Sequence, residues 1–203
     1  MAEQSRLSVY YCRAENDVEN GGASITNPPV KRQFDVLILG GGAAGLLCAI
    51  EAGKRGRRVA ILEHADRIGK KILISGGGRC NFTNLYCQPE NFLSANPHFA
   101  KSALARYTPS DFIALVEKHR IPYHEKKLGQ LFCDGSARAI VSMLEEECRA
   151  AHAEILVGVS AREPRRADEF VVTTDREEVS RRGTRRLHRR IVSCEDGCHP
   201  FRL

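Results

Sequence analysis

A glycine-rich turn between an apolar strand and a helix constrains this chain most. The four apolar residues Val36–Leu39 predict a strand that is buried on both faces of a parallel sheet. The pattern Gly40-x-Gly42-x-x-Gly45 follows at once, and residues 46–54 are predicted to form a helix. In such a turn the first glycine permits a tight bend, the second lets the backbone approach a diphosphate, and the third lets the helix lie against the strand.

The predicted ligand of this turn is a dinucleotide. The N-terminus of the predicted helix presents unpaired N–H groups that carry about half a positive charge. A second predicted strand, residues 58–62, ends at Glu63, where the motif places an acid that binds a ribose. The stretch therefore predicts an α/β fold, with a Rossmann-like parallel sheet and flanking helices. The alternative is a βαβ unit that binds no nucleotide.

A second glycine-rich stretch runs from Ser75 to Asn84. Its three consecutive glycines would destabilise a helix or a strand, because each loses much conformational entropy on folding. They predict a backbone that lies close to a flat or anionic group, with side-chain donors beside it from Arg79, Asn81, Thr83 and Asn84. The alternative is a surface turn that is rich in glycine.

Residues 40–45 and 69–84 together resemble the BaiN/RdsA family of NAD(P)- and FAD-dependent oxidoreductases, which are also described as aminoacetone oxidase family FAD-binding enzymes. The resemblance implies that the diphosphate of FAD lies at Gly40, Gly42, Ala43, Ala44 and Gly45, and that its ribose binds Glu63. It implies that the flavin end of FAD lies near Lys71, Gly77, Gly78, Arg79, Cys80 and Asn81.

The resemblance also implies chemistry. The family uses FAD, NAD(P)H is the implied reductant, and the implied substrate of the full-length family is a small molecule. No general acid or base is predicted. Cys80 has no second cysteine at Cys-x-x-Cys or Cys-x4-Cys spacing, so disulfide reductase chemistry is not expected.

The remaining pattern is consistent with that family. Helices are predicted over residues 99–107, 110–119 and 136–151, and strands over residues 121–125, 129–132, 154–159 and 170–174. The last strand is expected to belong to a hairpin of the β-meander that accompanies the FAD-binding sheet. Cys133 stands where the resemblance leads us to expect proline.

Composition limits partners and compartment. The chain has 203 residues and a net charge of +6. Residues 176–203 hold eight arginines and four acids, which gives +4 and leaves +2 for residues 1–175. No aromatic residue is interleaved with these arginines, so we do not expect nucleic acid to bind this tail. Eight scattered cysteines, and the absence of a predicted membrane span or secretion signal, favour a reduced, cytoplasmic protein.

The predicted organisation has three parts. Residues 1–32 are expected to be a disordered extension, residues 33–175 a partial FAD-binding domain, and residues 176–203 a disordered tail. For the tail we considered a basic nucleic-acid-binding arm and a zinc site of His188, Cys194, Cys198 and His199, and we favour a third interpretation, a shifted reading frame. A one-base shift over residues 189–203 allows Gly-Gly-Leu-Ser and Lys-Met-Gly-Ala-Thr, which resemble the family's next signature.

Two functions follow from these patterns. The first is a FAD-binding flavoprotein oxidoreductase, truncated at about half the family's length. The alternative is an inactive fragment that at most binds FAD or ADP weakly. The substrate is not predictable from the chain, and no metal site is expected.

Overall fold

The computed structural model describes residues 32–166, 170–174 and 178–181. They fall into two compact units: unit 1 combines the residues up to Gly69 with those from Leu144 onward, and unit 2 is Lys70–Met143. Residues 1–31 of the predicted N-terminal extension (residues 1–32) and residues 182–203 of the predicted disordered tail (residues 176–203), which include the zinc ligands and the stretch of the shifted reading frame, lie outside the described residues.

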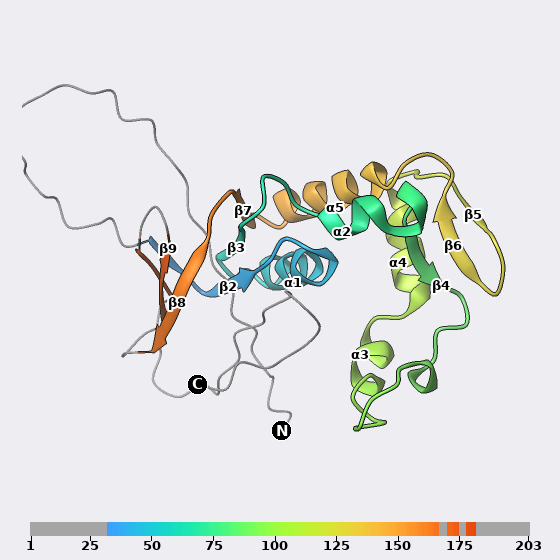
Figure 1. Cartoon of the computed structure of the whole chain (residues 1–203), viewed down its shortest axis with the longest axis horizontal. Coiled ribbons are helices and arrows are strands. Elements are labelled where there is room, and N and C mark those ends of the chain that lie inside the picture. The colour runs from blue at the N-terminus through green and yellow to red at the C-terminus, as the bar shows by residue number, and fades with distance from the viewer. Residues whose placement is uncertain (1–31, 167–169, 175–177, 182–203) are drawn as a thin grey trace, which may run out of the picture. The chain divides into compact units, whose positions relative to one another are not determined.

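The core of unit 1 is a parallel sheet of three strands. Its order is β2-β3-β7, with bounds β2 (Val36–Leu39), β3 (Val59–Glu63) and β7 (Glu154–Val157). Every residue of the central strand β3 is buried. Helix α1 (Ala43–Lys54) connects β2 to β3 and packs against both (Figure 1). This strand–turn–helix–strand order confirms the predicted Rossmann-like α/β fold.

A second sheet of unit 1 joins the two ends of the described chain. Its order is β1-β10-β9-β8, with bounds β1 (Arg32–Phe34), β8 (Ala161–Arg166), β9 (Phe170–Thr174) and β10 (Glu178–Arg181). Strands β8 and β9 form the predicted antiparallel hairpin. The sequence predicted no regular element after Asp175, yet β10 pairs with β9 and, in parallel, with β1. The hydrogen bonds of β10 come from two neighbouring strands, and its sequence shows no alternation of apolar and polar residues that would have predicted it.

Helix α5 (Arg138–Ala150) confirms the helix predicted over residues 136–151 and is shorter than predicted at both ends. Its last turns pack against α1. A Cβ atom added to Gly53 would lie 2.2 Å from the carbonyl oxygen of Ala151, so the two backbones are in direct contact there. The buried Glu147 carboxylate lies 3.4 Å from Lys54 Nζ, which provides the cation that a buried acid needs.

Unit 2 contains an antiparallel sheet with the order β4-β6-β5. Its elements are α2 (Lys70–Ile74), the 3-10 turn η1 (Ser75–Gly78), β4 (Asn81–Asn84), the 3-10 turn η2 (Pro89–Asn91), α3 (Lys101–Arg106), α4 (Pro109–Lys118), β5 (Tyr123–Glu125) and β6 (Gln130–Cys133). Phe82 of β4 packs against the rings of Phe112 and Tyr123, at centroid distances of 5.9 and 5.5 Å. The sequence predicted neither α2 nor β4.

Within the described residues, no helix is both long and apolar enough to cross a membrane.

Candidate nucleotide-binding site

The glycine-rich turn connects β2 to α1 in unit 1. Gly40 has a φ of 98°, and its N–H donates to the carbonyl oxygen of Leu62 in β3 over 2.7 Å. A Cβ atom on Gly45 would lie 2.1 Å from the carbonyl oxygen of Gly40 and 2.9 Å from Ile38 Cγ2. Only glycine at position 45 therefore lets the helix start this close to the strand.

Gly42 faces open space, in contrast to Gly45. It is the N-cap residue of α1, with a φ of −80°, and a Cβ atom built on it would meet no atom within 4 Å. Leu46 N–H donates to the Gly42 carbonyl oxygen over 2.9 Å, which closes the first turn of the helix. Helix geometry leaves the N–H groups of Ala43, Ala44 and Gly45 without an intrahelical acceptor. Since Ala43 and Ala44 are exposed, this helix end can receive an anion.

Glu63 is 8% exposed and holds the glycine-rich turn in place. Its Oε2 accepts a hydrogen bond from Gly41 N–H and its Oε1 accepts one from Ala65 N–H, both over 2.8 Å. His64 Nδ1 lies 3.2 Å from Oε1. A carboxylate offers about four acceptor positions, so it can still receive a ribose hydroxyl. Gly69 N–H donates to the Gly41 carbonyl oxygen over 2.8 Å, which fixes the turn from its other side.

Unit 1 thus brings together six of the residues predicted from the sequence. They are Gly40, Gly42, Ala43, Ala44, Gly45 and Glu63. The other six, Lys71, Gly77, Gly78, Arg79, Cys80 and Asn81, lie in unit 2.

The three glycines of the second stretch adopt left-handed backbone conformations, with φ values of 56°, 68° and 85° for Gly76, Gly77 and Gly78. A Cβ atom on Gly76 would lie 2.7 Å from the ring of Phe132, so this glycine is required by the protein's own packing. A Cβ atom on Gly77 would meet nothing within 4 Å. Of the two, Gly77 is the one whose backbone can approach a ligand.

The polar residues of this stretch divide into two kinds. Lys71 and Arg79 are exposed, and within the described part of the chain no acid forms a salt bridge with Arg79. The amide nitrogen of Asn81, in the orientation that satisfies it, donates to the carbonyl oxygens of Thr83 and Leu131 over 3.1 and 3.2 Å. Asn84 Nδ2 donates to the Leu128 carbonyl oxygen over 2.9 Å. The two asparagine side chains therefore make hydrogen bonds within unit 2.

Cys80 is buried and has a φ of 54°. Burial raises the pKa of its thiol, and a hydrogen bond with Ser75 lowers that pKa in part. Burial, together with the neighbouring Cys80 and Asp134, raises the pKa of Cys133 to about 11. Neither thiol is a ready nucleophile at neutral pH, because the thiolate is the reactive form.

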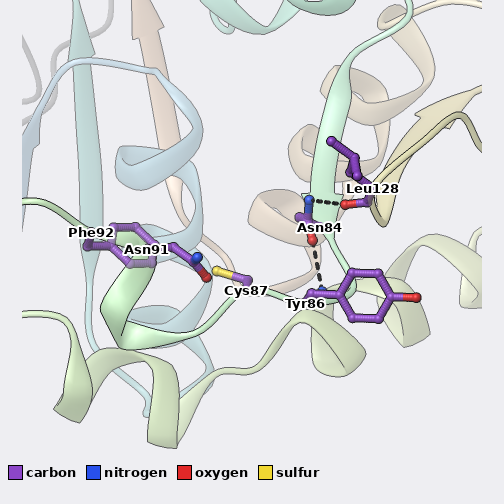
Figure 2. A pocket seen from close by; sticks show the side chains of 6 residues that line it. All are labelled: Asn84, Tyr86, Cys87, Asn91, Phe92 and Leu128. Carbon is purple, nitrogen blue, oxygen red and sulfur yellow. Dashed lines mark hydrogen bonds between the residues drawn. The ribbon is translucent and has the colours of Figure 1, made fainter.

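An open pocket of about 320 Å³ in unit 2 was not predicted from the sequence. Figure 2 shows Cys87, Asn91 and Phe92 on one side of it and Asn84, Tyr86 and Leu128 on the other. Tyr86 and Leu128 are 65% and 78% exposed. The available signal was a cluster of apolar and aromatic residues in the segment 85–93, which follows no helical or strand period.

Two relatives are similar to part of this chain. The ribosomal RNA dihydrouridine synthase of Escherichia coli is 61% identical over 116 residues, which cover 57% of this chain and 29% of the relative. The 3-dehydro-bile acid delta(4,6)-reductase of Clostridium scindens is 35% identical over 130 residues, which cover 60% of this chain and 30% of the relative. The matches thus span about 30% of the length of these curated relatives.

Solved structures and a family model agree with the fold. The 3-ketosteroid-delta4-(5alpha)-dehydrogenase of Rhodococcus jostii has a TM-score of 0.53 at 16% identity, covering 79% of this chain and 46% of that one. At this identity the likeness concerns the fold alone. The model of the HI0933-like protein Rossmann domain matches residues 34–185, which extends past β10. The chain therefore belongs to the HI0933-like Rossmann domain family, in agreement with the resemblance found in its sequence.

Proposed function

We propose that this chain forms the dinucleotide-binding part of a flavin-dependent reductase and that its ligand is FAD. The observation that carries the proposal is the open space at Gly42, next to a helix end whose first N–H groups have no intrahelical acceptor. A bound diphosphate would accept hydrogen bonds from Ala43 and Ala44 N–H, and Glu63 would accept one from the adenosine ribose. These residue types fit the adenosine diphosphate half of FAD.

The second group of residues supports the flavin half of the proposal. Gly77 offers an open, left-handed backbone, and the exposed cations Lys71 and Arg79 flank it in sequence. FAD would supply hydride transfer, with NAD(P)H as the source of the hydride. The protein's own part is to orient the cofactor and to set the charge near it.

The proposed substrate class follows from the relatives' names. Dihydrouridine differs from uridine by two hydrogen atoms, so a dihydrouridine synthase and a steroid-type reductase both add hydrogen to a carbon–carbon double bond. We propose uridine in ribosomal RNA as the substrate of the full-length protein, because the more similar relative carries that name. A small molecule remains the second candidate, favoured by the bile acid reductase.

The experiment begins with the cofactor. The purified 203-residue chain is titrated with FAD, and binding is followed by the quenching of flavin fluorescence, with ADP as competitor. We expect saturable binding that ADP displaces. The bound flavin is then mixed anaerobically with NADH or NADPH. Loss of the oxidised flavin absorbance supports the oxidoreductase, whereas binding without reduction supports the alternative of an inactive, FAD- or ADP-binding chain.

A further inference from the structure

Positive charge is concentrated in unit 2. Residues 70–143 contain ten Lys or Arg and five Asp or Glu, which gives a net charge of +5. Residues 144–175 carry a net charge of −4, and for this reason the net charge of residues 1–175 as a whole is only +2. Unit 2 is also where the open pocket lies. None of the six residues that line the pocket is charged, and the nearest lysines in sequence, Lys126 and Lys127, precede the lining residue Leu128. Positive charge attracts phosphate-bearing ligands.

One lining residue of the pocket, Leu128, lies in the turn between β5 and β6. Lys126 N–H donates to the Gln130 carbonyl oxygen and Gln130 N–H donates to the Lys127 carbonyl oxygen, over 3.0 and 3.1 Å. Asn84 links the turn to β4 through its bond to the Leu128 carbonyl oxygen. Leu128 and Gly129 have φ values of 54° and 76°, so these hydrogen bonds hold a backbone that is rarely adopted by non-glycine residues.

Tyr86 lies directly against this turn. A Cβ atom on Gly129 would lie 2.6 Å from Tyr86 Cδ2, and Tyr86 N–H donates to Asn84 Oδ1 over 2.8 Å. The ring is held on one side by the turn and is nevertheless 65% exposed. It therefore offers a fixed aromatic surface, and a nucleobase stacks well on such a surface.

Polar groups across the pocket from the ring and in the neighbouring turn suit a nucleotide. Asn91 Oδ1 accepts the N–H of Gln88 over 2.7 Å, which leaves the amide N–H donors of Asn91 for the carbonyl oxygens of a pyrimidine. Lys126 and Lys127 are exposed, and no acid of the described residues forms a salt bridge with either. Lys126 Nζ lies 5.2 Å from the ring centre of Phe132, which holds it near the turn. Glu90 and Glu125 are the nearby opposing charges, and Glu125 Oε1 accepts Gly129 N–H.

We propose that this surface, formed by Tyr86, Asn91, Lys126 and Lys127, binds single-stranded RNA. One base stacks on the Tyr86 ring in the pocket, and the phosphates beside it contact Lys126 and Lys127. The choice of RNA as the ligand rests on the proposed function. The pocket volume lies at the lower end of the range of small-ligand sites, in keeping with one base rather than a larger group.

The test measures binding of a short fluorescein-labelled oligouridylate to the full chain by anisotropy, over a series of salt concentrations. Tyr86→Leu should weaken binding roughly 5-fold to 100-fold, since stacking is lost, whereas Tyr86→Phe should bind like the parent chain. Lys126→Gln combined with Lys127→Gln should reduce the slope of log K against log salt by about 1.4. Arg138→Gln is the matched control, because it removes one exposed charge beyond the other end of β6 and should leave affinity at the pocket and the Tyr86 effect unchanged.

The outcomes separate this proposal from the function proposed above. FAD titration of the same samples reports the cofactor site independently. RNA binding with the expected variant pattern supports the surface even if FAD does not bind. Binding that is equal in the parent chain, Tyr86→Leu and the double lysine variant overturns it, since RNA then binds elsewhere. The proposal is also overturned if polyglutamate displaces the labelled oligouridylate as effectively as unlabelled oligouridylate does, because the surface then attracts any polyanion without stacking a base.

Discussion

Replacing Gly42 with valine should block the dinucleotide without disturbing the fold. Gly42 has a φ of −80°, which valine can adopt, and its missing Cβ atom faces space that is free of protein atoms within 4 Å. The added side chain would occupy the position in which the diphosphate approaches the helix end. Folding and ligand binding are therefore separable at this one residue.

The size of the effect follows from the hydrogen bonds that are lost. A diphosphate at this helix end would accept from the N–H groups of Ala43 and Ala44, and each charge-assisted hydrogen bond contributes about 1.5–3 kcal/mol. Loss of both corresponds to about 3–6 kcal/mol. Because about 1.4 kcal/mol equals a tenfold change, FAD affinity should fall by roughly 10²-fold to 10⁴-fold.

The assay compares FAD affinity and thermal midpoint for Gly42→Val and for a matched control, Gly135→Val. Gly135 also has no atom within 4 Å of an added Cβ atom, but it lies outside the glycine-rich turn. The control should change neither quantity. Unchanged FAD affinity in Gly42→Val, with FAD bound by the parent chain, would refute the assignment of the diphosphate to this helix end.

Three further predictions concern stability. Gly45→Ala places a methyl group 2.1 Å from the Gly40 carbonyl oxygen, so the free energy of unfolding should fall by at least about 1–3 kcal/mol in urea denaturation, and an unchanged midpoint would contradict the close packing. Glu63→Gln replaces one buried acceptor by a donor and should lower the free energy of unfolding by about 1–3 kcal/mol in the same assay. Because glutamine does not titrate, this loss should be the same at every pH. Burial raises the pKa of Cys148 from 9.0 to about 12 and that of Cys133 to about 11. The unfolded thiols ionise first, so stability should fall as pH rises from about 9 toward 12, and a thermal midpoint that increases over this range would contradict the burial of these thiols.

The region from β2 to β3 was predictable because its signals are local. An apolar strand, three spaced glycines, a helix and an acid lie within residues 36–63, and each element stabilises its neighbour in sequence. The second glycine stretch was harder, because Gly76 is required by Phe132, a residue 56 positions later. Strand β10 was missed in part for the same reason, since one of its two partners, β1, pairs with it from 147 positions earlier in the chain.

The candidate site shows the same division. Gly42 and Glu63 were predicted from spacing, and the structure adds that Glu63 also accepts a hydrogen bond from Gly41 N–H within the turn. The pocket at Tyr86 was not identified, because its position depends on contact with Gly129 across the sheet of unit 2. A side chain that is exposed and lies in no periodic pattern carries no sequence signal of its own.

The pairing of β1 with β10 has a consequence for the order in which the protein folds on the ribosome. Arg32 pairs with Val179, 147 positions later, whereas Val36 pairs with Val59, 23 positions later. Closing the longer loop costs about 1.6 kcal/mol more in chain entropy. The last strand of the parallel sheet to be synthesised is β7, which ends at Val157, so this sheet can assemble while translation continues. The sheet that contains β1 must wait until Arg181 has left the exit tunnel, and until then β1 emerges as a strand without its partner, which is a point where a nascent chain needs protection from aggregation.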